Sequence, residues 1–373
     1  MIGRIIALAL ACVLAPLSAR ADTLDPATVR TIDAVADDAM RQRHIPSVVI
    51  MVARHGQTVF ARAYGTRNIH DDVPATVDTV YQYGSLTKQF TAMGIFLLAQ
   101  DGKVSLDHPI AKYLPEFARK GKITIRHLLV HTSGLANCTE PDDYPFAIAP
   151  RLDLTTRWCI DYGVRRPPDF PVGTKASYSN VGHVILARII EKVGGTSFDT
   201  FLRTRILTPA RMSEAAPFDY ASIVPKMAAG YTWYENRLQR APFWNLRTVD
   251  GAGYLIGTAS DLLAWDQALL RGTLLSPKWQ KEYFAIGHLA NGTPAGVGVE
   301  NPTGGSAAHY VYGGVALMRQ GGVTIYGANG GTFGFLSFNA IVPERDLAVV
   351  TLTNLGAIDN SKLTKPILDA LLK

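Results

Sequence analysis

The sequence has little clustered charge and few long apolar runs. After residue 21, no stretch of about 18 apolar residues occurs, so no membrane-spanning helix is expected in the mature chain. Lys and Arg number 37 against 31 Asp and Glu, a net charge of +6, and no basic block is longer than Arg165-Arg166. We therefore expect no nucleic-acid partner, because such a partner requires a basic patch that neutralises several phosphates.

Several catalytic and cofactor motifs are also missing. The chain has no G-x-S-x-G nucleophile elbow, no Walker phosphate loop, no H-E-x-x-H zinc motif and no G-x-G-x-x-G fingerprint. His127 and His131 have the i, i+4 spacing of a metal edge, but no carboxylate or third ligand accompanies them. We expect no metal and no cofactor.

One apolar run stands out, and it lies at the N-terminus. Residues 1–21 have a basic start at Arg4, an apolar middle and an A-x-A ending at Ala19-Arg20-Ala21. These are the parts of a secretory signal peptide. We expect cleavage after Ala21 and an exported protein, periplasmic or secreted. Lipid attachment at Cys12 is the alternative, although the residues before Cys12 fit a lipid-attachment site poorly.

Cysteine is scarce, with 3 residues in the whole chain. Removal of the N-terminal segment leaves Cys138 and Cys159, and in an oxidising compartment such a pair is expected to be bridged. A bridge would close a loop of about 20 residues and stabilise the fold by about 3 kcal/mol in the chain-entropy model. Two separate buried thiols are the alternative.

Strand-like segments gather at both ends of the chain. A helix at 26–43 precedes an expected hairpin at 47–53 and 58–64. The C-terminal strands are expected at 315–318, 323–326, 335–342 and 347–353, and the Gly-rich stretch 327–334 separates two of them. Between the two ends, helices are expected at 85–100, 125–131, 181–193 and 259–271.

The simplest assembly of these segments is an α+β fold with two domains. Residues 22–84 and 295–373 would form a discontinuous domain around one antiparallel sheet, flanked by helices. Residues 85–294 would form an inserted, mostly helical domain, with an active site at the interface.

The first segment that carries chemistry is Ser85-Leu86-Thr87-Lys88. A helix is expected to begin at Ser85, which puts free N–H groups and partial positive charge beside the hydroxyl. Lys88 would lie one turn on, within reach of the Ser85 oxygen, and a desolvated amine there would accept its proton. A Ser N-cap followed by a solvated Lys is the alternative.

Two further segments carry polar or backbone groups suited to catalysis. Tyr178-Ser179-Asn180 precedes a helix, and a Tyr near a cationic Lys can be driven toward phenolate; packing under the helix start is the alternative. Gly327-Ala328-Asn329-Gly330-Gly331 heads an apolar strand, where glycine permits close approach of a ligand and an N–H can serve an oxyanion hole. A tight turn is the alternative there.

Together, these segments resemble the serine β-lactamase-related hydrolases. This group includes class C β-lactamases, D-alanyl-D-alanine carboxypeptidases, D-aminopeptidases and family VIII esterases. The resemblance runs from about residue 47 to 354 and includes the string HLLVHTSGL at 127–135. It implies a β-lactamase/transpeptidase-like fold and acyl-serine hydrolysis of an ester, amide or β-lactam bond in a small-molecule or peptide substrate. It does not indicate the oligomeric state.

The resemblance also implies roles for individual residues. Ser85 would be the acylated nucleophile, Lys88 its activator and Tyr178 the group that exchanges protons. Asn180 would orient Lys88 and the substrate amide. The N–H groups of Ser85 and Gly331 would form the oxyanion hole. Ala328, Asn329, Gly330 and Gly331 of the third motif would bind and orient the substrate.

One position departs from the pattern of the group. The third motif normally begins with Lys or His, whereas this sequence has Ala328. Loss of that cation removes a charge-assisted contact of about 1.5–3 kcal/mol to a substrate carboxylate. The departure favours an esterase or a weak, broad hydrolase. It also leaves open a catalytically inactive, ligand-binding protein of the cell envelope.

Overall fold

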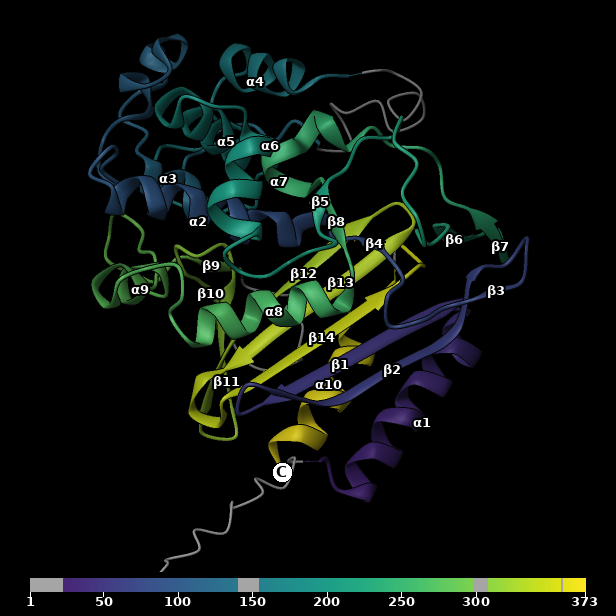
Figure 1. Cartoon of the computed structure of the whole chain (residues 1–373). Helices are drawn as coiled ribbons and strands as arrows, with labels where there is room; N and C mark the ends of the chain where they lie inside the picture. Colours follow the sequence, from purple (N-terminus) through teal and green to yellow (C-terminus); the bar gives the residue numbers. More distant parts are fainter. Residues whose placement is uncertain (1–22, 140–153, 298–307, 357) are drawn as a thin grey trace, which may run out of the picture.

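Within the residues that the structure describes, a nine-stranded antiparallel sheet forms the centre of the molecule (Figure 1). The computed structural model describes residues 23–139, 154–297, 308–356 and 358–373, so the predicted signal peptide lies outside the described residues. The strand order is β3-β2-β1-β14-β13-β12-β11-β10-β9. The strands are β1 (Ser47–Arg54), β2 (Gln57–Asn68), β3 (Val73–Pro74), β9 (Gly296–Val297), β10 (Ala308–Tyr310), β11 (Ala316–Gln320), β12 (Val323–Thr332), β13 (Phe335–Val342) and β14 (Leu347–Thr353). Because β1 pairs with β14, the predicted sheet built from both chain ends is confirmed.

Helices cover both faces of the sheet. They are α1 (Pro26–Arg43) and α10 (Ser361–Leu372) on one face and α8 (Ala259–Leu270) on the other. Alternate residues of a strand point to opposite faces, so Val48 and Ile50 join the core under α1 and α10, whereas Val49 and Met51 join the core under α8. Burial on both faces explains the unbroken apolar run, and each such side chain stabilises the fold by about 1.5–3 kcal/mol.

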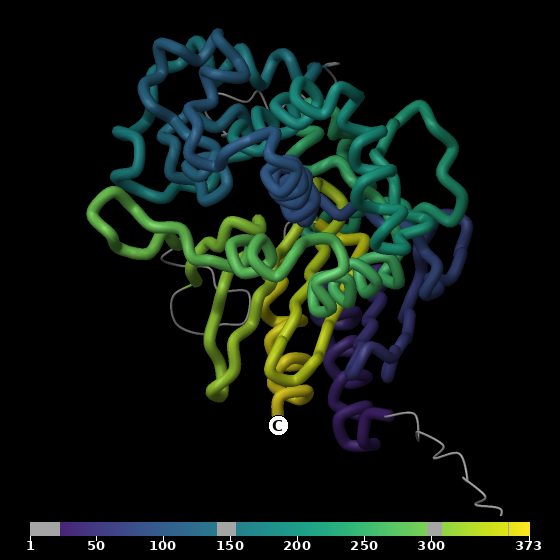
Figure 2. Tube along the Cα trace, turned by 60° about the vertical axis from the view of Figure 1, so that its left-hand side comes forward, coloured from purple at the N-terminus to yellow at the C-terminus, as the bar shows by residue number. Residues whose placement is uncertain are grey.

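The remaining helices gather beside one end of the sheet, away from α1 and α10 (Figure 2). They are α2 (Thr87–Gln100), α3 (Ile125–Leu129), α4 (Thr156–Arg165), α5 (Asn180–Gly194), α6 (Phe198–Leu202), α7 (Asp250–Gly253) and α9 (Pro277–Tyr283). Helix α2 is buried along nearly its whole length and packs against α5 and α7. Of the helices in the described ranges, none has both the length and the hydropathy to cross a membrane.

Short strands connect these helices. A small sheet joins β4 (Tyr81–Gln82), β8 (Leu255–Gly257) and β5 (Ala216–Pro217), and a separate hairpin joins β6 (Tyr231–Tyr234) and β7 (Arg237–Arg240). Helix α8 packs on β1, β13 and β14, although it falls within 85–294. The division of the chain into two domains stays a prediction.

Two local expectations were wrong. The helix expected from Ser85 begins at Thr87, because Gly84–Leu86 forms a 3-10 turn, η1. The stretch 327–334, expected to separate two strands, is mostly strand: β12 continues to Thr332 and pairs with β13 throughout. Glycine is required there for close approach, since a Cβ on Gly330 would lie 1.9 Å from the Tyr83 carbonyl oxygen.

Candidate active site

Ser85 lies on the turn η1, between β4 and α2. Gly84 has a φ of 52°, which glycine adopts without strain. A Cβ on Gly84 would lie 2.7 Å from the Gly331 nitrogen, so the absence of a side chain lets the turn press against β12. The backbone of Gly331, predicted to donate to an oxyanion, therefore lies beside the residue that precedes Ser85.

The structure brings Ser85, Lys88 and Tyr178 together. Ser85 Oγ lies 2.5 Å from the Tyr178 hydroxyl oxygen and 3.1 Å from Lys88 Nζ. Lys88 Nζ also lies 4.7 Å from the centre of the Tyr178 ring. Residues about 90 positions apart thus form one hydrogen-bonded set, which comes from η1, α2 and the segment before α5.

Lys88 is buried and makes three polar contacts. Its Nζ contacts Ser85 Oγ and donates to Asn180 Oδ1 and to the Ala252 carbonyl oxygen, both at 2.8 Å. The residue is 2% exposed, and burial lowers the pKa of Lys88 well below its ordinary value. A neutral amine has two hydrogens, which Asn180 and Ala252 accept, so its lone pair is left for the Ser85 proton. This geometry suits a general base.

The orientation of the Asn180 side chain follows from its other partners. Asn180 Nδ2 donates to Thr139 Oγ1 at 2.7 Å, and the Asn180 backbone N–H donates to Asn137 Oδ1 at 3.0 Å. Because only the oxygen of an amide accepts, this arrangement turns Asn180 Oδ1 toward Lys88. Asn137 and Thr139 act through Asn180 and are positioning residues. Sequence reasoning missed both, although they flank Cys138.

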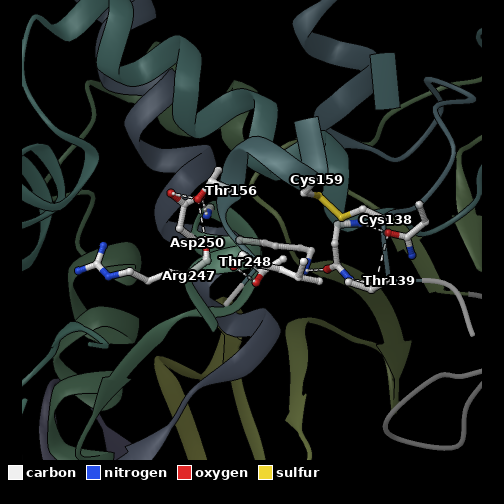
Figure 3. The surroundings of a disulfide bond; sticks show 12 residues. Cys138, Thr139, Thr156, Cys159, Arg247, Thr248 and Asp250 are labelled. Atoms are coloured by element: carbon white, nitrogen blue, oxygen red, sulfur yellow. Dashed lines mark hydrogen bonds between the residues drawn. A yellow bond between two sulfur atoms is a disulfide. The ribbon is translucent and has the colours of Figure 1, made fainter. Parts of the chain in front are cut away.

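Cys138 and Cys159 form a disulfide, with Cα atoms 5.3 Å apart (Figure 3). Cys159 belongs to α4, and Cys138 lies between the two residues that hold Asn180. The alternative of two separate thiols is therefore wrong for this structure. The bridge ties the segment that orients Asn180 to a helix.

Tyr178 keeps its proton in this arrangement. The pKa of Tyr178 is raised to about 12, because desolvation outweighs the hydrogen bond with Ser85. We expected a cationic Lys88 to favour phenolate, but burial disfavours the Lys88 cation that would stabilise it. The Tyr178 residue remains 38% exposed. Tyr178 thus presents a neutral phenol, which can donate a proton to a departing group.

His131 fixes the segment that carries Tyr178. Its carbonyl oxygen accepts from the Ser177 N–H at 2.9 Å, and its Nδ1 accepts from the Ser179 N–H at 3.2 Å. The centres of the His131 and Tyr178 rings lie 4.8 Å apart. Burial and the nearby Lys88 lower the pKa of His131 to about 3, so its imidazole is neutral.

His127 instead caps α3, where its Nδ1 accepts from the Thr124 N–H at 3.0 Å. In the described ranges, no three His, Cys, Asp or Glu side chains gather as metal ligands would.

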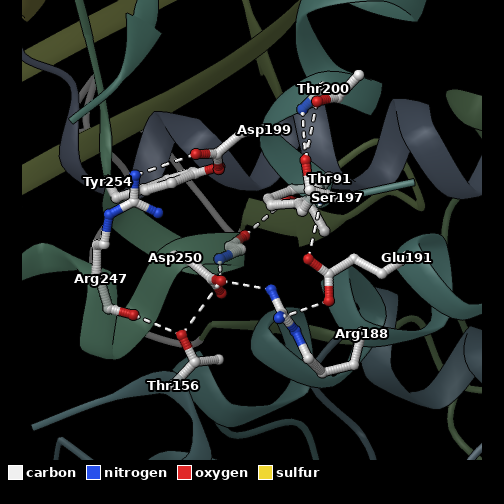
Figure 4. Close-up of polar contacts among 12 residues, drawn as sticks. Thr91, Thr156, Arg188, Glu191, Ser197, Asp199, Thr200, Arg247, Asp250 and Tyr254 are labelled. Carbon is white, nitrogen blue, oxygen red and sulfur yellow. Dashed lines mark hydrogen bonds and ion pairs between the residues drawn. The ribbon is translucent and has the colours of Figure 1, made fainter. Parts of the chain in front are cut away.

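The turn α7 presents the Ala252 carbonyl to Lys88, and a partly buried polar cluster supports this turn (Figure 4). Arg188 Nη2 lies 2.5 Å from Asp250 Oδ2, and Arg188 Nη1 lies 2.6 Å from Glu191 Oε2. Burial raises the pKa of Asp250 to about 6, against the opposing effect of Arg188. Thr91 Oγ1 donates to the Gly251 carbonyl at 2.6 Å and ties the turn to α2.

The third motif lies on β12. Ala328 lines the cavity beside Ser85, and Gly330 lies close to the backbone carbonyl of Tyr83. Asn329 Oδ1 accepts from Asn360 Nδ2 at 3.1 Å, next to α10. Successive strand residues face opposite ways, so the Asn329 side chain is directed away from Ser85. Asn329 nevertheless lines the cavity beside Ser85, so its role in substrate binding stays a prediction.

A cavity of about 430 Å³ opens beside Ser85. Two of its sides differ in chemistry. The first, which we name the catalytic wall, comprises Ser85, Lys88 and Tyr178; the second, which we name the strand wall, comprises Val315, Ala316, Gly327 and Ala328. Leu129, His131, Tyr310, Gly314 and Asn329 complete the lining.

The chain is similar to known proteins along most of its length. A family model described as Beta-lactamase matches residues 32–372. The chain is 29% identical over 275 residues to penicillin-binding protein 4* of Bacillus subtilis, with 68% of this chain and 59% of that protein covered. It is 29% identical over 331 residues to penicillin-binding protein 4 of Amycolatopsis lactamdurans, with 86% and 84% covered. The chain thus spans about three fifths of the first relative.

Solved structures show the same fold. An octameric penicillin-binding protein homologue from Pyrococcus abyssi matches with a TM-score of 0.80 and 25% identity over 92% of this chain and 77% of that chain. The D-amino acid amidase of Ochrobactrum anthropi matches with a TM-score of 0.79 and 24% identity, over 92% and 98%. These likenesses confirm the fold class that the sequence predicts.

Proposed function

The chain belongs to the β-lactamase family, and we propose that it is an exported serine hydrolase that forms an acyl-enzyme on Ser85. Its substrates would contain an ester, amide or β-lactam bond. One observation carries this proposal: Ser85 Oγ lies within hydrogen-bond distance of both a buried amine, Lys88, and a phenol, Tyr178. Such a set supplies a nucleophile, a base and an acid at one point.

Acylation moves one proton from Ser85 to the leaving group. Neutral Lys88 accepts the hydroxyl proton while Ser85 Oγ bonds to the carbonyl carbon of the substrate. The N–H groups of Ser85 and Gly331 stabilise the negative oxygen, at roughly 10²–10³ in rate for one such donor. Tyr178 protonates the leaving oxygen or nitrogen as its bond to carbon breaks, and Lys88 returns a proton to Tyr178.

Deacylation uses one water molecule. The water oxygen bonds to the acyl carbon, and one water proton passes to the Lys88 and Tyr178 pair. The bond between the acyl carbon and Ser85 Oγ then breaks, and that proton returns to Ser85. The carboxylic acid leaves, and the enzyme regains its starting protonation state.

Labelling with a fluorophosphonate or a penicillin probe tests this proposal. Mass spectrometry of the digested protein is expected to place the adduct on Ser85, and Ser85→Ala is expected to abolish it. Label that forms equally on the intact protein and on Ser85→Ala would refute an acyl-Ser85 mechanism.

Export is the second part of the proposal. Its support is the signal-peptide pattern at 1–21 together with the disulfide between Cys138 and Cys159, which is typical of oxidising compartments. Expression of the full chain, followed by cell fractionation and N-terminal sequencing, is expected to give a mature protein that begins at Asp22. An uncleaved chain confined to the cytosol would contradict export.

A binding protein without turnover is the competing function. The observation that favours it is Ala328, where related sequences are expected to have a cation. Assays with p-nitrophenyl esters and a chromogenic cephalosporin separate the two functions, with Ser85→Ala as the control. Any turnover that depends on Ser85 rejects the binding-only function.

A further inference from the structure

We propose that the cavity beside Ser85 selects substrates whose group against the strand wall is uncharged, so that neutral carboxylic esters are preferred over carboxylate-bearing lactams and peptides and over ammonium-bearing amides. This inference rests on the proposed function, because it takes Ser85 to be the nucleophile. It adds the substrate class, which the fold and the family leave open.

The strand wall offers only small apolar groups and backbone. Ala316 lies opposite Gly327 in the register of β11 and β12, and Ala328 follows on the cavity side. Val315 extends the same surface and is buried against Tyr326 and Ala328. At position 328, where the third motif of the related hydrolases begins with Lys or His, this chain presents the methyl group of Ala328 to the cavity.

The described residues that line the cavity include no Asp or Glu and, besides Lys88, no Lys or Arg. Lys88 is a poor anchor for a substrate anion, since Asn180, Ala252 and Ser85 already occupy its polar contacts. His131 is buried and contributes a neutral imidazole. A substrate carboxylate or ammonium would thus lose its hydration without gaining an ionic partner among the described lining residues, which disfavours its binding.

An anionic substrate would also disturb the base. An anion close to Lys88 favours the ammonium form of Lys88, which cannot accept the Ser85 proton. An uncharged substrate leaves the amine neutral. Because the strand wall offers no anchor for a substrate anion, it favours substrates that leave Lys88 neutral, the form that can accept the Ser85 proton.

A second cavity, lined by other residues, contains a cationic side chain, that of Arg240. That cavity, of about 690 Å³, is lined by Gly331 and Thr332 of β12, by aromatic side chains and by Arg240. Tyr234, Trp244 and Phe333 supply the aromatic surface. Because Arg240 offers an anion a different anchor, the test below includes Arg240→Gln.

Three p-nitrophenyl esters that differ chiefly in charge test the inference: the butyrate, the anionic monoester of glutaric acid and the cationic ester of 4-aminobutyrate. Each kcat/KM is taken after subtraction of the uncatalysed rate, because the carboxylate and the amine of the charged esters attack their own ester bond. The butyrate is expected to exceed both charged esters by roughly tenfold or more. Equal values for the three esters, with turnover dependent on Ser85, would overturn the inference.

Ala328→Lys, with Ala328→Met as the control of similar length, sharpens the test. We expect Ala328→Lys to raise kcat/KM for the anionic ester relative to the butyrate by roughly ten- to a hundredfold, and Ala328→Met to leave that ratio within about threefold. Equal ratios in the two variants would contradict the role of Ala328. Anionic turnover in the unmodified protein that Arg240→Gln removes would also overturn the inference.

Failure of this inference differs from failure of the proposed function. If no ester is turned over in a Ser85-dependent way, the proposed function fails. If Ser85-dependent turnover occurs without preference among the three esters, only the substrate class fails.

Discussion

The catalytic wall and the strand wall of the cavity have opposite characters. On the catalytic wall, Lys88 is fixed by three polar contacts, and behind it Asn180 is fixed by two more. On the strand wall, Ala328 presents only a methyl group. The residues that we propose for acyl transfer are thus held by several polar contacts, whereas the strand wall offers no charged group to a substrate. In our proposal, the chemistry and the choice of substrate therefore depend on separate elements of the fold.

Removal of the amine from the catalytic wall has the largest expected effect. Lys88→Met keeps the length of the side chain but has no lone pair to accept the Ser85 proton, so we expect kcat to fall by roughly 10³–10⁴. Steady-state kinetics with a neutral ester measures the loss. Circular dichroism and a thermal melt confirm that the variant folds, and a folded variant with near-normal kcat would place the base elsewhere.

Removal of the phenol has the next largest effect. Tyr178→Phe keeps the ring beside His131 and removes only the hydroxyl that contacts Ser85, so we expect kcat to fall by roughly 10²–10³ with little change in KM. Esters with progressively better leaving groups test the role as an acid. The deficit is expected to shrink as the leaving group improves; a constant deficit would point to a positioning role alone.

The disulfide connects the catalytic wall to the rest of the molecule. Replacement of Cys138 and Cys159 by Ser is expected to lower the free energy of unfolding by about 3 kcal/mol, measured by denaturant titration. Because Asn137 and Thr139 flank Cys138, kcat is also expected to fall in the folded variant. A loss of stability with unchanged kcat would show that the bridge is not needed to orient Asn180.

Thr139→Val has the smallest expected effect and isolates the orientation of Asn180. The variant keeps the shape of Thr139 but no longer accepts from Asn180 Nδ2, at a cost of about 1 kcal/mol, so kcat is expected to fall by about fivefold. The acidic limb of the pH–rate profile should also shift, since Asn180 contacts Lys88, the proposed base. A change in the melting temperature alone would leave Thr139 a purely structural role.

The contrast between the walls also separates what the sequence could predict from what it could not. The S-x-x-K spacing placed Lys88 beside Ser85 because one helical turn brings these positions together. The sheet was predictable from β-branched runs such as 47–53. The strand at 327–332 was not, because glycine has low strand propensity and its reason there is the distant carbonyl of Tyr83.

Tertiary contacts account for the rest. Asn137 and Thr139 contact Asn180 across more than 40 residues of sequence. No local sequence pattern predicts these contacts. The direction of the Asn329 side chain follows from strand parity, which required β12 to be recognised first. The protonation of Tyr178 depends on burial, which spacing alone does not reveal.

The pH dependence of Ser85 labelling by an uncharged fluorophosphonate tests the central claim most directly. The claim predicts that the labelling rate rises with pH to a plateau whose midpoint lies well below the ordinary lysine pKa of about 10.4, since burial lowers the pKa of Lys88. It also predicts that Lys88→Met loses this titration. A midpoint at the ordinary lysine value, or the same profile in Lys88→Met, would contradict the claim that a neutral Lys88 activates Ser85.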